Sequence, residues 1–124
     1  MIVAGIVAGF GFSNRATEAS LAEAFAALQQ RPDRVATLRT KAESPVFRAF
    51  AIAEGLSVYA LDEAQISGVA TQTLSPRIHA RFNTGSVAEA AALVGAGAGA
   101  RLIQTRYVTT DGLATVALAE MIER

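Results

Sequence analysis

Short runs of apolar residues, several of them rich in β-branched side chains, recur along the chain and predict strands. The first run, over residues 2–8, is apolar at nearly every position, which is typical of a strand buried on both faces of a sheet. Comparable runs follow at residues 35–38, 56–60, 101–104 and 113–118. Asp111-Gly112 lies in the turn-rich segment between the last two runs, so these two strands are predicted to pair antiparallel.

Other segments repeat apolar residues every three or four positions, which predicts helices. Residues 17–30 place Leu21 and Phe25 on the same face of such a helix. Two Ser-Pro pairs, at positions 44–45 and 75–76, each supply a capping hydroxyl and a proline suited to the first helical position. Further helical segments are predicted over residues 45–54, 61–66, 76–82 and 87–94, whereas residues 67–74 follow neither pattern.

Ser86 and Glu89 have the spacing of a capping box, in which each side chain accepts a hydrogen bond from the other residue's backbone N–H. Strands and helices alternate through most of the chain, and a hairpin closes it. This order predicts one domain over residues 1–124, an α/β fold with three layers, α/β/α. Its sheet is expected to be mixed, mostly parallel and built of about five strands.

The composition excludes several classes of function. The chain has 124 residues, with 11 basic and 11 acidic side chains, one histidine and no cysteine. A balanced charge argues against nucleic acid as a partner, which needs an excess of clustered Lys and Arg. Without cysteine, the chain has no thiol nucleophile, disulfide or zinc site of the usual Cys/His kind. We expect no metal and no cofactor.

The apolar start of the chain does not have the character of a targeting or membrane segment. Residues 1–12 lack a basic beginning, contain three glycines and fall short of the ~20 residues that a spanning helix needs. We therefore expect a cytoplasmic protein with no membrane partner.

A glycine-rich segment over residues 9–14 follows the first predicted strand and is interpreted as a turn. Backbone N–H groups at such a strand-to-helix turn can bind an anion. A nicotinamide site is disfavoured, because no acidic residue occurs among residues 35–41, where the dinucleotide fingerprint needs one. The remaining alternative is that the glycines only let a strand and a helix pack closely.

Lys41, beside Glu43, is the only lysine and follows the second predicted strand. Ligands of open α/β sheets bind outside the carboxyl ends of the strands, so Lys41 is a candidate ligand-binding residue. The other ten basic residues are arginines, which reflect either genomic composition or a surface that binds carboxylate or phosphate. The roles of Arg77, His79 and Arg81 stay open.

Four segments, at residues 9–17, 40–45, 84–93 and 115–119, read GFGFSNRAT, TKAESP, TGSVAEAAAL and TVALA. In this order and spacing, the chain resembles the CobE/CbiG C-terminal domain family of cobalamin biosynthesis. The resemblance implies a small α/β domain that handles corrin-ring precursors. In longer members, the domain belongs to an enzyme that opens a ring lactone and releases acetaldehyde, whereas a separate domain of this size is similar to members of the aerobic route.

The resemblance also implies which residues form the site. The motif matches directly at Lys41, Gly85, Ser86 and Glu89, while Glu43 and Arg106 are the nearest equivalents of a family glutamate and lysine. The family often has Cys-Arg after its first Gly-x-Gly, and Phe12-Ser13 stands there in this chain. The expected ligand-binding residues are Gly11, Ser13, Asn14, Arg15, Lys41, Gly85, Ser86 and Arg106.

Three hypotheses for the function follow. The first is a protein that binds a carboxylate-rich corrin or precorrin intermediate and carries it or assists its conversion. The second is a hydrolase that opens a lactone on such an intermediate, with Glu43 or Glu89 as the catalytic acid or base. The third is a module whose partners are other enzymes of the cobalamin pathway.

Overall fold

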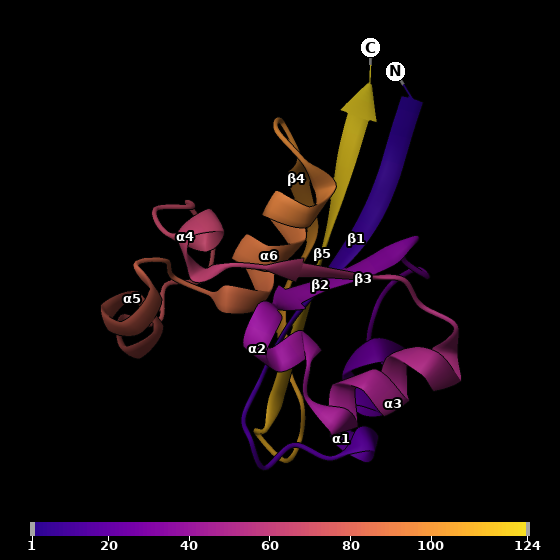
Figure 1. Ribbon diagram of the computed structural model, residues 1–124. Helices are drawn as coiled ribbons and strands as arrows, with labels where there is room; N and C mark the ends of the chain where they lie inside the picture. The colour runs from indigo at the N-terminus through magenta and orange to yellow at the C-terminus, as the bar shows by residue number, and fades with distance from the viewer. Residues whose placement is uncertain (1, 124) are drawn as a thin grey trace.

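One mixed sheet organises the part of the chain that the computed structural model describes, residues 2–123, and Met1 and Arg124 of the predicted domain lie outside it. Its strands are β1 (Ile2–Phe12), β2 (Arg34–Leu38), β3 (Val58–Leu61), β4 (Arg101–Val108) and β5 (Ala114–Glu123), in the order β3-β2-β1-β5-β4 (Figure 1). The first three strands run parallel, and β5 runs antiparallel to both β1 and β4. The carboxyl ends of β1 to β4 therefore meet at one edge of the sheet.

Helices cover both faces of this sheet, so the three-layer α/β/α prediction is confirmed (Figure 1). The helices are α1 (Glu18–Ala26), α2 (Arg39–Ala42), α3 (Pro45–Glu54), α4 (Glu63–Ile66), α5 (Pro76–Phe82) and α6 (Val87–Ala96). One face packs against α1 and α3, and the opposite face packs against α6, with α4 and α5 beside it. Within the described residues, no helix combines the length and the hydropathy that crossing a membrane requires.

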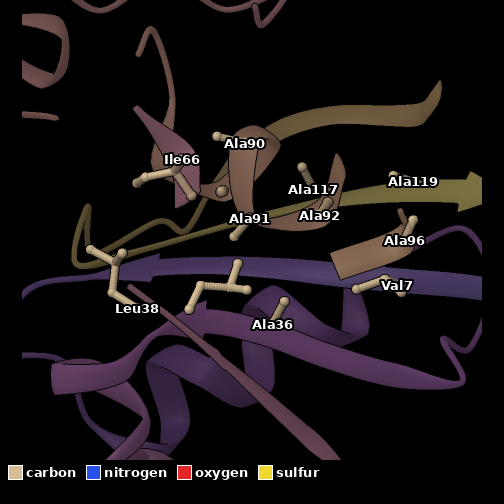
Figure 2. Close-up of a cluster of buried hydrophobic side chains, with 12 residues drawn as sticks. Val7, Ala36, Leu38, Ile66, Ala90, Ala91, Ala92, Ala96, Ala117 and Ala119 are labelled. Carbon is tan, nitrogen blue, oxygen red and sulfur yellow. The ribbon is translucent and has the colours of Figure 1, made fainter. Parts of the chain in front are cut away.

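The face beneath α6 is built from small side chains. Figure 2 shows alanines of α6, among them Ala91 and Ala92, packed over Val7 of β1 and Ala36 of β2. The closest approach is at Gly9, where an added Cβ would lie 2.0 Å from the carbonyl oxygen of Ala88. The backbone of α6 therefore rests almost directly on β1.

The opposite face is built from aromatic rings. Phe10 of β1 lies with its ring centroid 5.6 Å from those of both Phe47 and Phe50 of α3. Phe12, two residues further along the same face of β1, stacks on Phe47 with 5.4 Å between the ring centroids and an interplanar angle of 7°. These offset and edge-to-face contacts fill the space between the sheet and α3.

The glycine-rich segment is not the turn that the sequence predicts. Residues 9–12 continue β1, which pairs with β5 as far as the Phe12 and Ala114 partners, and the chain turns only at Ser13. The interpretation as an anion-binding turn is therefore wrong for Gly9 and Gly11. The alternative is confirmed at Gly9, because the missing side chain lets the strand and α6 pack closely.

Several predicted boundaries shift as well. The first helix ends at Ala26 rather than at residue 30, and residues 39–42, for which the sequence predicts no element, form α2. Both strands of the closing hairpin extend beyond the predicted runs, because each continues to find a hydrogen-bonding partner in the other or in β1. The start of α5 after Ser75 and the end of α3 before Gly55 fall where the sequence predicts, and Gly55 adopts the left-handed conformation of a C-cap.

Candidate functional site

A cleft of about 260 Å³ opens at the edge of the sheet where the carboxyl ends of β1, β2 and β4 meet. The start of β5, the amino-terminal end of α6 and helix α5 complete its walls. The residues that line it are Gly11, Phe12, Ser13, Leu38, Lys41, Ser75, Arg77, Ile78, Phe82, Ser86, Val87, Arg106, Gly112, Leu113, Ala114 and Thr115. After β1 the chain adds β2 and β3 on one side of it, and then crosses to β4 on the other side. Such a reversal of strand order leaves a crevice at the carboxyl ends of the strands in open α/β sheets.

Three charged residues line the cleft, Lys41, Arg77 and Arg106, and all three are cations. Among the described residues, the ion pairs use other side chains: Arg39 with Asp62, Arg81 with Glu63 and Arg101 with Glu120. The cleft therefore carries an excess of positive charge although the chain as a whole is neutral. Such a surface suits an anionic ligand, because each cation can donate charge-assisted hydrogen bonds to carboxylate or phosphate oxygens.

Lys41 is half-buried on the wall formed by α2. Its Nζ donates a 2.8 Å hydrogen bond to Oδ1 of Asn14 and lies 5.1 Å from the centroid of the Phe12 ring. Burial lowers the pKa of the Lys41 ammonium, since no carboxylate is paired with it in the described part of the chain. An ammonium has three N–H donors, so Lys41 has donors left for a ligand after bonding Asn14.

Arg106 enters the cleft from an irregular part of β4. The register of β4 against β5 shifts between Gln104 and Tyr107, so that two residues of β4 stand opposite the single residue Ala117. Such a bulge turns side chains away from the regular alternation of a strand. The backbone N–H of Arg106 donates a 2.9 Å hydrogen bond to Oε2 of Glu89 on α6.

Glu89 is fully buried and receives hydrogen bonds on both carboxylate oxygens. Oε1 accepts from the backbone N–H groups of Gln72 and Thr73, each at 2.9 Å, and Oε2 accepts from the Thr73 hydroxyl and from Arg106. Burial by itself would raise the pKa of Glu89, but these four hydrogen bonds together lower it. The carboxylate therefore stays ionised inside the protein.

The predicted capping box forms only in part. The Ser86 hydroxyl accepts a 3.2 Å hydrogen bond from the backbone N–H of Glu89 and caps α6. The Glu89 carboxylate does not return this bond to Ser86, because it turns toward residues 72–73 and Arg106. The motif that the sequence marks as a helix cap thus also joins three separate segments of the chain.

Gly85 brings the segment before α5 close to α6. An added Cβ at Gly85 would lie 2.2 Å from the carbonyl oxygen of Thr73, and the Ser75 N–H donates a 2.9 Å hydrogen bond to the Gly85 carbonyl. This contact places the start of α5 at the cleft and brings Arg77 to its rim.

The structure places five of the ten residues that the sequence predicts for the site in the lining of the cleft. The cleft is lined by Gly11, Ser13, Lys41, Ser86 and Arg106. Three others lie behind the lining: Asn14 accepts a hydrogen bond from Lys41, Gly85 packs on Thr73, and Glu89 is buried behind Arg106. Arg15 is exposed outside the cleft, and its backbone N–H donates to the Ser13 hydroxyl. Glu43 lines a different, shallower groove beside α3 and β3.

The sequence pattern does not show that the α5 residues Arg77, Ile78 and Phe82 line the cleft. Their placement depends on the irregular segment 67–74, which shows no periodicity. The β5 residues of the cleft, such as Thr115, were open to prediction, because the closing hairpin necessarily brings the start of β5 to the end of β4.

Within residues 2–123, no cluster of three or more His, Cys, Asp or Glu side chains has the arrangement of a metal site. The hydrogen-bonding groups of the cleft are instead two arginines, one lysine and several hydroxyls. The cleft is also lined by apolar side chains, among them Leu38, Ile78 and Leu113, so it offers apolar surface as well as cations.

Comparisons with known proteins agree on one family. A family model described as "Cobalamin synthesis G C-terminus" matches residues 6–119. A solved structure of CobE, a protein from the cobalamin (vitamin B12) biosynthetic pathway, superposes with a TM-score of 0.78 at 24% identity and covers 100% of this chain and 96% of its own. The cobalamin biosynthesis protein chiG of Agrobacterium tumefaciens str. C58 matches with a TM-score of 0.72 at 30% identity, covering 95% and 99% of the two chains.

A longer relative contains the same fold. A structure from Sulfolobus solfataricus, described as a homologue of cobalamin biosynthesis protein G, matches with a TM-score of 0.68 at 18% identity. The match covers 94% of this chain and 36% of the longer one. The search of curated proteins gave no match.

Proposed function

The chain belongs to the cobalamin synthesis G C-terminus family of the cobalamin biosynthesis pathway, and we propose that its cleft binds a corrin precursor through carboxylates at the edge of the ring. The observation that carries this proposal is that three cations, Lys41, Arg77 and Arg106, line the cleft together with apolar side chains and with no acidic residue.

The chemistry of a corrin precursor matches this arrangement. Such a molecule is a wide macrocycle with an apolar face, edged by acetate and propionate groups. Phe12 and Phe82 offer apolar surface, while the cations and the Ser13 hydroxyl offer donors to carboxylates. A charge-assisted hydrogen bond of this kind contributes about 1.5–3 kcal/mol where it is desolvated and much less at an exposed edge.

The size of the cleft determines how much of the ring it encloses. Pockets that enclose a drug-sized ligand usually measure roughly 300–1,000 Å³, and this cleft measures about 260 Å³. A macrocycle is larger than such ligands, so we propose that one edge of it enters the cleft and the rest stays accessible. This mode of binding suits a protein that hands its ligand to, or receives it from, another enzyme of the pathway.

Binding is a better supported proposal than lactone hydrolysis. Of the two candidate catalytic carboxylates, Glu43 lines another groove and Glu89 is fully buried with four hydrogen-bond donors around it. A general acid or base must come within hydrogen-bond reach of the reacting group.

An absorbance titration with hydrogenobyrinic acid tests the proposal. We expect saturable binding at micromolar ligand, and weaker binding of the methyl ester of the same ring, which has no carboxylate charge. Lys41→Ala should weaken binding more than Arg77→Ala, because Lys41 is half-buried and Arg77 is exposed.

The matched control is Arg48→Ala, which removes an exposed arginine from α3 outside the cleft. This variant should bind like the wild-type protein. Equal affinity of the acid and its ester, or an equal loss in all three variants, would refute the proposed carboxylate site.

A further inference from the structure

Glu89 has no part in the proposed binding chemistry, yet both oxygens of its buried carboxylate accept two hydrogen bonds each. It is a fully buried carboxylate whose four donors are backbone N–H groups and one hydroxyl, with no cation among them. A helix start can be capped by Ser86 alone, so capping does not require a charge at this position. We therefore look for its role in the segments that donate to it, which its hydrogen bonds hold in place.

Three of these donors, including the Thr73 hydroxyl, belong to the segment that leads into α5. The backbone N–H groups of Gln72 and Thr73 both bind Oε1, and Ser75, two residues later, caps α5. These bonds hold the wall of the cleft that carries Arg77. The Glu89 carboxylate thus binds the backbone of the segment that leads to the wall with Arg77.

The fourth donor belongs to the opposite wall. Arg106 lies in the bulge of β4, where the shifted register leaves its backbone outside the ladder with β5. Its N–H is bound by Oε2 of Glu89 instead. A buried N–H without a partner would be unfavourable, so this bond fixes the conformation of the bulge that directs Arg106 into the cleft.

We infer that Glu89 is a positioning residue, which sets Arg106, and through the segment at residues 72–73 also Arg77, at the two walls of the cleft. The effect of Glu89 on ligand affinity rests on the proposed function. Its effect on the backbone of Arg106 does not, and this difference allows the two to be tested separately.

The substitution Glu89→Gln is a selective probe of this role. The amide oxygen can take the place of Oε1 and keep both N–H groups of residues 72 and 73. The amide nitrogen then faces the Thr73 hydroxyl, which can turn to accept, and the Arg106 N–H, which cannot. Of the four donors, the N–H of Arg106 is therefore the one that loses its partner.

Thr73→Val is the matched control. It removes one donor from the same oxygen, Oε2, and leaves the bond between Glu89 and Arg106 in place. Both variants lose one buried hydrogen bond, so a purely structural role of Glu89 would affect them alike. Loss of the positioning of Arg106 is expected in Glu89→Gln alone.

The affinity for hydrogenobyrinic acid is then measured for Arg106→Ala, Glu89→Gln and the double variant. We expect Arg106→Ala to weaken binding about tenfold or more, which corresponds to the loss of a charge-assisted hydrogen bond. Glu89→Gln should weaken binding by no more than this, and the double variant should bind like Arg106→Ala. Equal losses in Glu89→Gln and Thr73→Val, or losses that multiply in the double variant, would overturn the inference.

A second measurement needs no ligand. In the wild-type protein, amide hydrogen exchange at Arg106 should be slow although no strand partner faces it, and it should become fast in Glu89→Gln but not in Thr73→Val. Fast exchange in the wild type, or slow exchange in Glu89→Gln, refutes the positioning role. If Arg106 exchanges as expected and hydrogenobyrinic acid does not bind, the proposed function fails and the positioning role stands.

Discussion

The two faces of the sheet are packed with side chains of very different size. Toward α3, the rings of Phe10, Phe47 and Phe50 lie 5.6–5.8 Å apart between centroids. Toward α6, the core consists largely of alanines and of Gly9, and the helix backbone approaches the strand so closely that a methyl group has no room (Figure 2). Rings hold a helix away from a sheet, and small residues let it lie directly on it.

The two faces therefore have different roles: one mainly stabilises the domain, and the other mainly positions α6. The aromatic face buries large apolar surfaces, which is the main source of stability in a small domain. The face beneath α6 instead sets the height of the helix above the sheet, which places Ser86 at the cleft and the buried Glu89 behind Arg106. The aromatic face should therefore be sensitive to lost volume, and the α6 face to added volume.

The largest expected effect is that of Phe47→Ala on the aromatic face. Removing a fully buried ring that contacts three other rings should lower the free energy of unfolding by about 3–5 kcal/mol. Urea denaturation measures this change. Phe47→Leu keeps most of the volume and should lose clearly less, and an equal loss would show that ring volume is not what stabilises this face.

The next effect is that of Gly9→Ala beneath α6. The added methyl group would lie 2.0 Å from the Ala88 carbonyl oxygen and 2.4 Å from the Ala92 nitrogen, so the helix must move, at a loss of about 3 kcal/mol. Gly5→Ala is the control, because it adds the same group to the same strand, where the nearest atom lies 3.9 Å away. A thermal shift of Gly9→Ala no larger than that of Gly5→Ala would contradict the close packing.

A smaller effect depends on pH. The pKa of Glu89 is lowered in the folded protein, so its ionisation stabilises the fold above the unfolded pKa of about 4.3, and this stability is lost as the pH falls through the folded pKa. Glu89→Gln should lower the free energy of unfolding by about 2 kcal/mol at neutral pH, since it strands a buried donor.

The control is the pH dependence of the difference in free energy of unfolding between the wild-type protein and Glu89→Gln. Glu23 and Asp111 also have lowered pKa values, because hydrogen bonds from Thr110 and from Ser20 stabilise their charged forms, and both remain in the variant. The difference between wild type and variant therefore isolates Glu89. It should shrink below about pH 4.3, and a difference that stays constant down to pH 3 would exclude the ionised carboxylate as its source.

The smallest expected effect on stability is that of Lys41→Ala. Its ammonium makes one hydrogen bond, to exposed Asn14, so the free energy of unfolding should change by less than about 0.5 kcal/mol. Thermal unfolding measures this. A large loss would place Lys41 in the stabilising core and not at a binding surface.

Local patterns were sufficient to predict where α3, α5 and α6 begin and where α3 ends, but not the short helix α2. The hydroxyl of Thr17, the Ser75-Pro76 pair and the left-handed Gly55 act within a few residues of themselves, so the sequence carries these signals directly. The length of β1 was not predictable, because residues 9–12 continue as a strand only where β5, about a hundred residues later, pairs with them. Glycines that signal a turn in isolation here mark a close approach of α6.

The site was predictable in part for the same reason. The carboxyl-end rule for open α/β sheets placed Lys41, and the family resemblance added Ser86 and Arg106. The position of Arg77 depends on the contact between Gly85 and the segment before α5, which shows no periodic pattern. The partners of Glu89 lie 16 and 17 residues before it and 17 residues after it, beyond the reach of any capping rule.

Mapping of ¹⁵N-labelled protein with hydrogenobyrinic acid is the most direct test of where the ligand binds. We predict saturable shifts at amides that line the cleft, such as those of Phe12, Ser13, Lys41, Arg77 and Arg106, and little change at α3 residues outside it, such as Arg48 and Ile52. Saturable shifts centred on the groove beside α3 and β3, or no shifts at millimolar ligand, would contradict binding in the cleft.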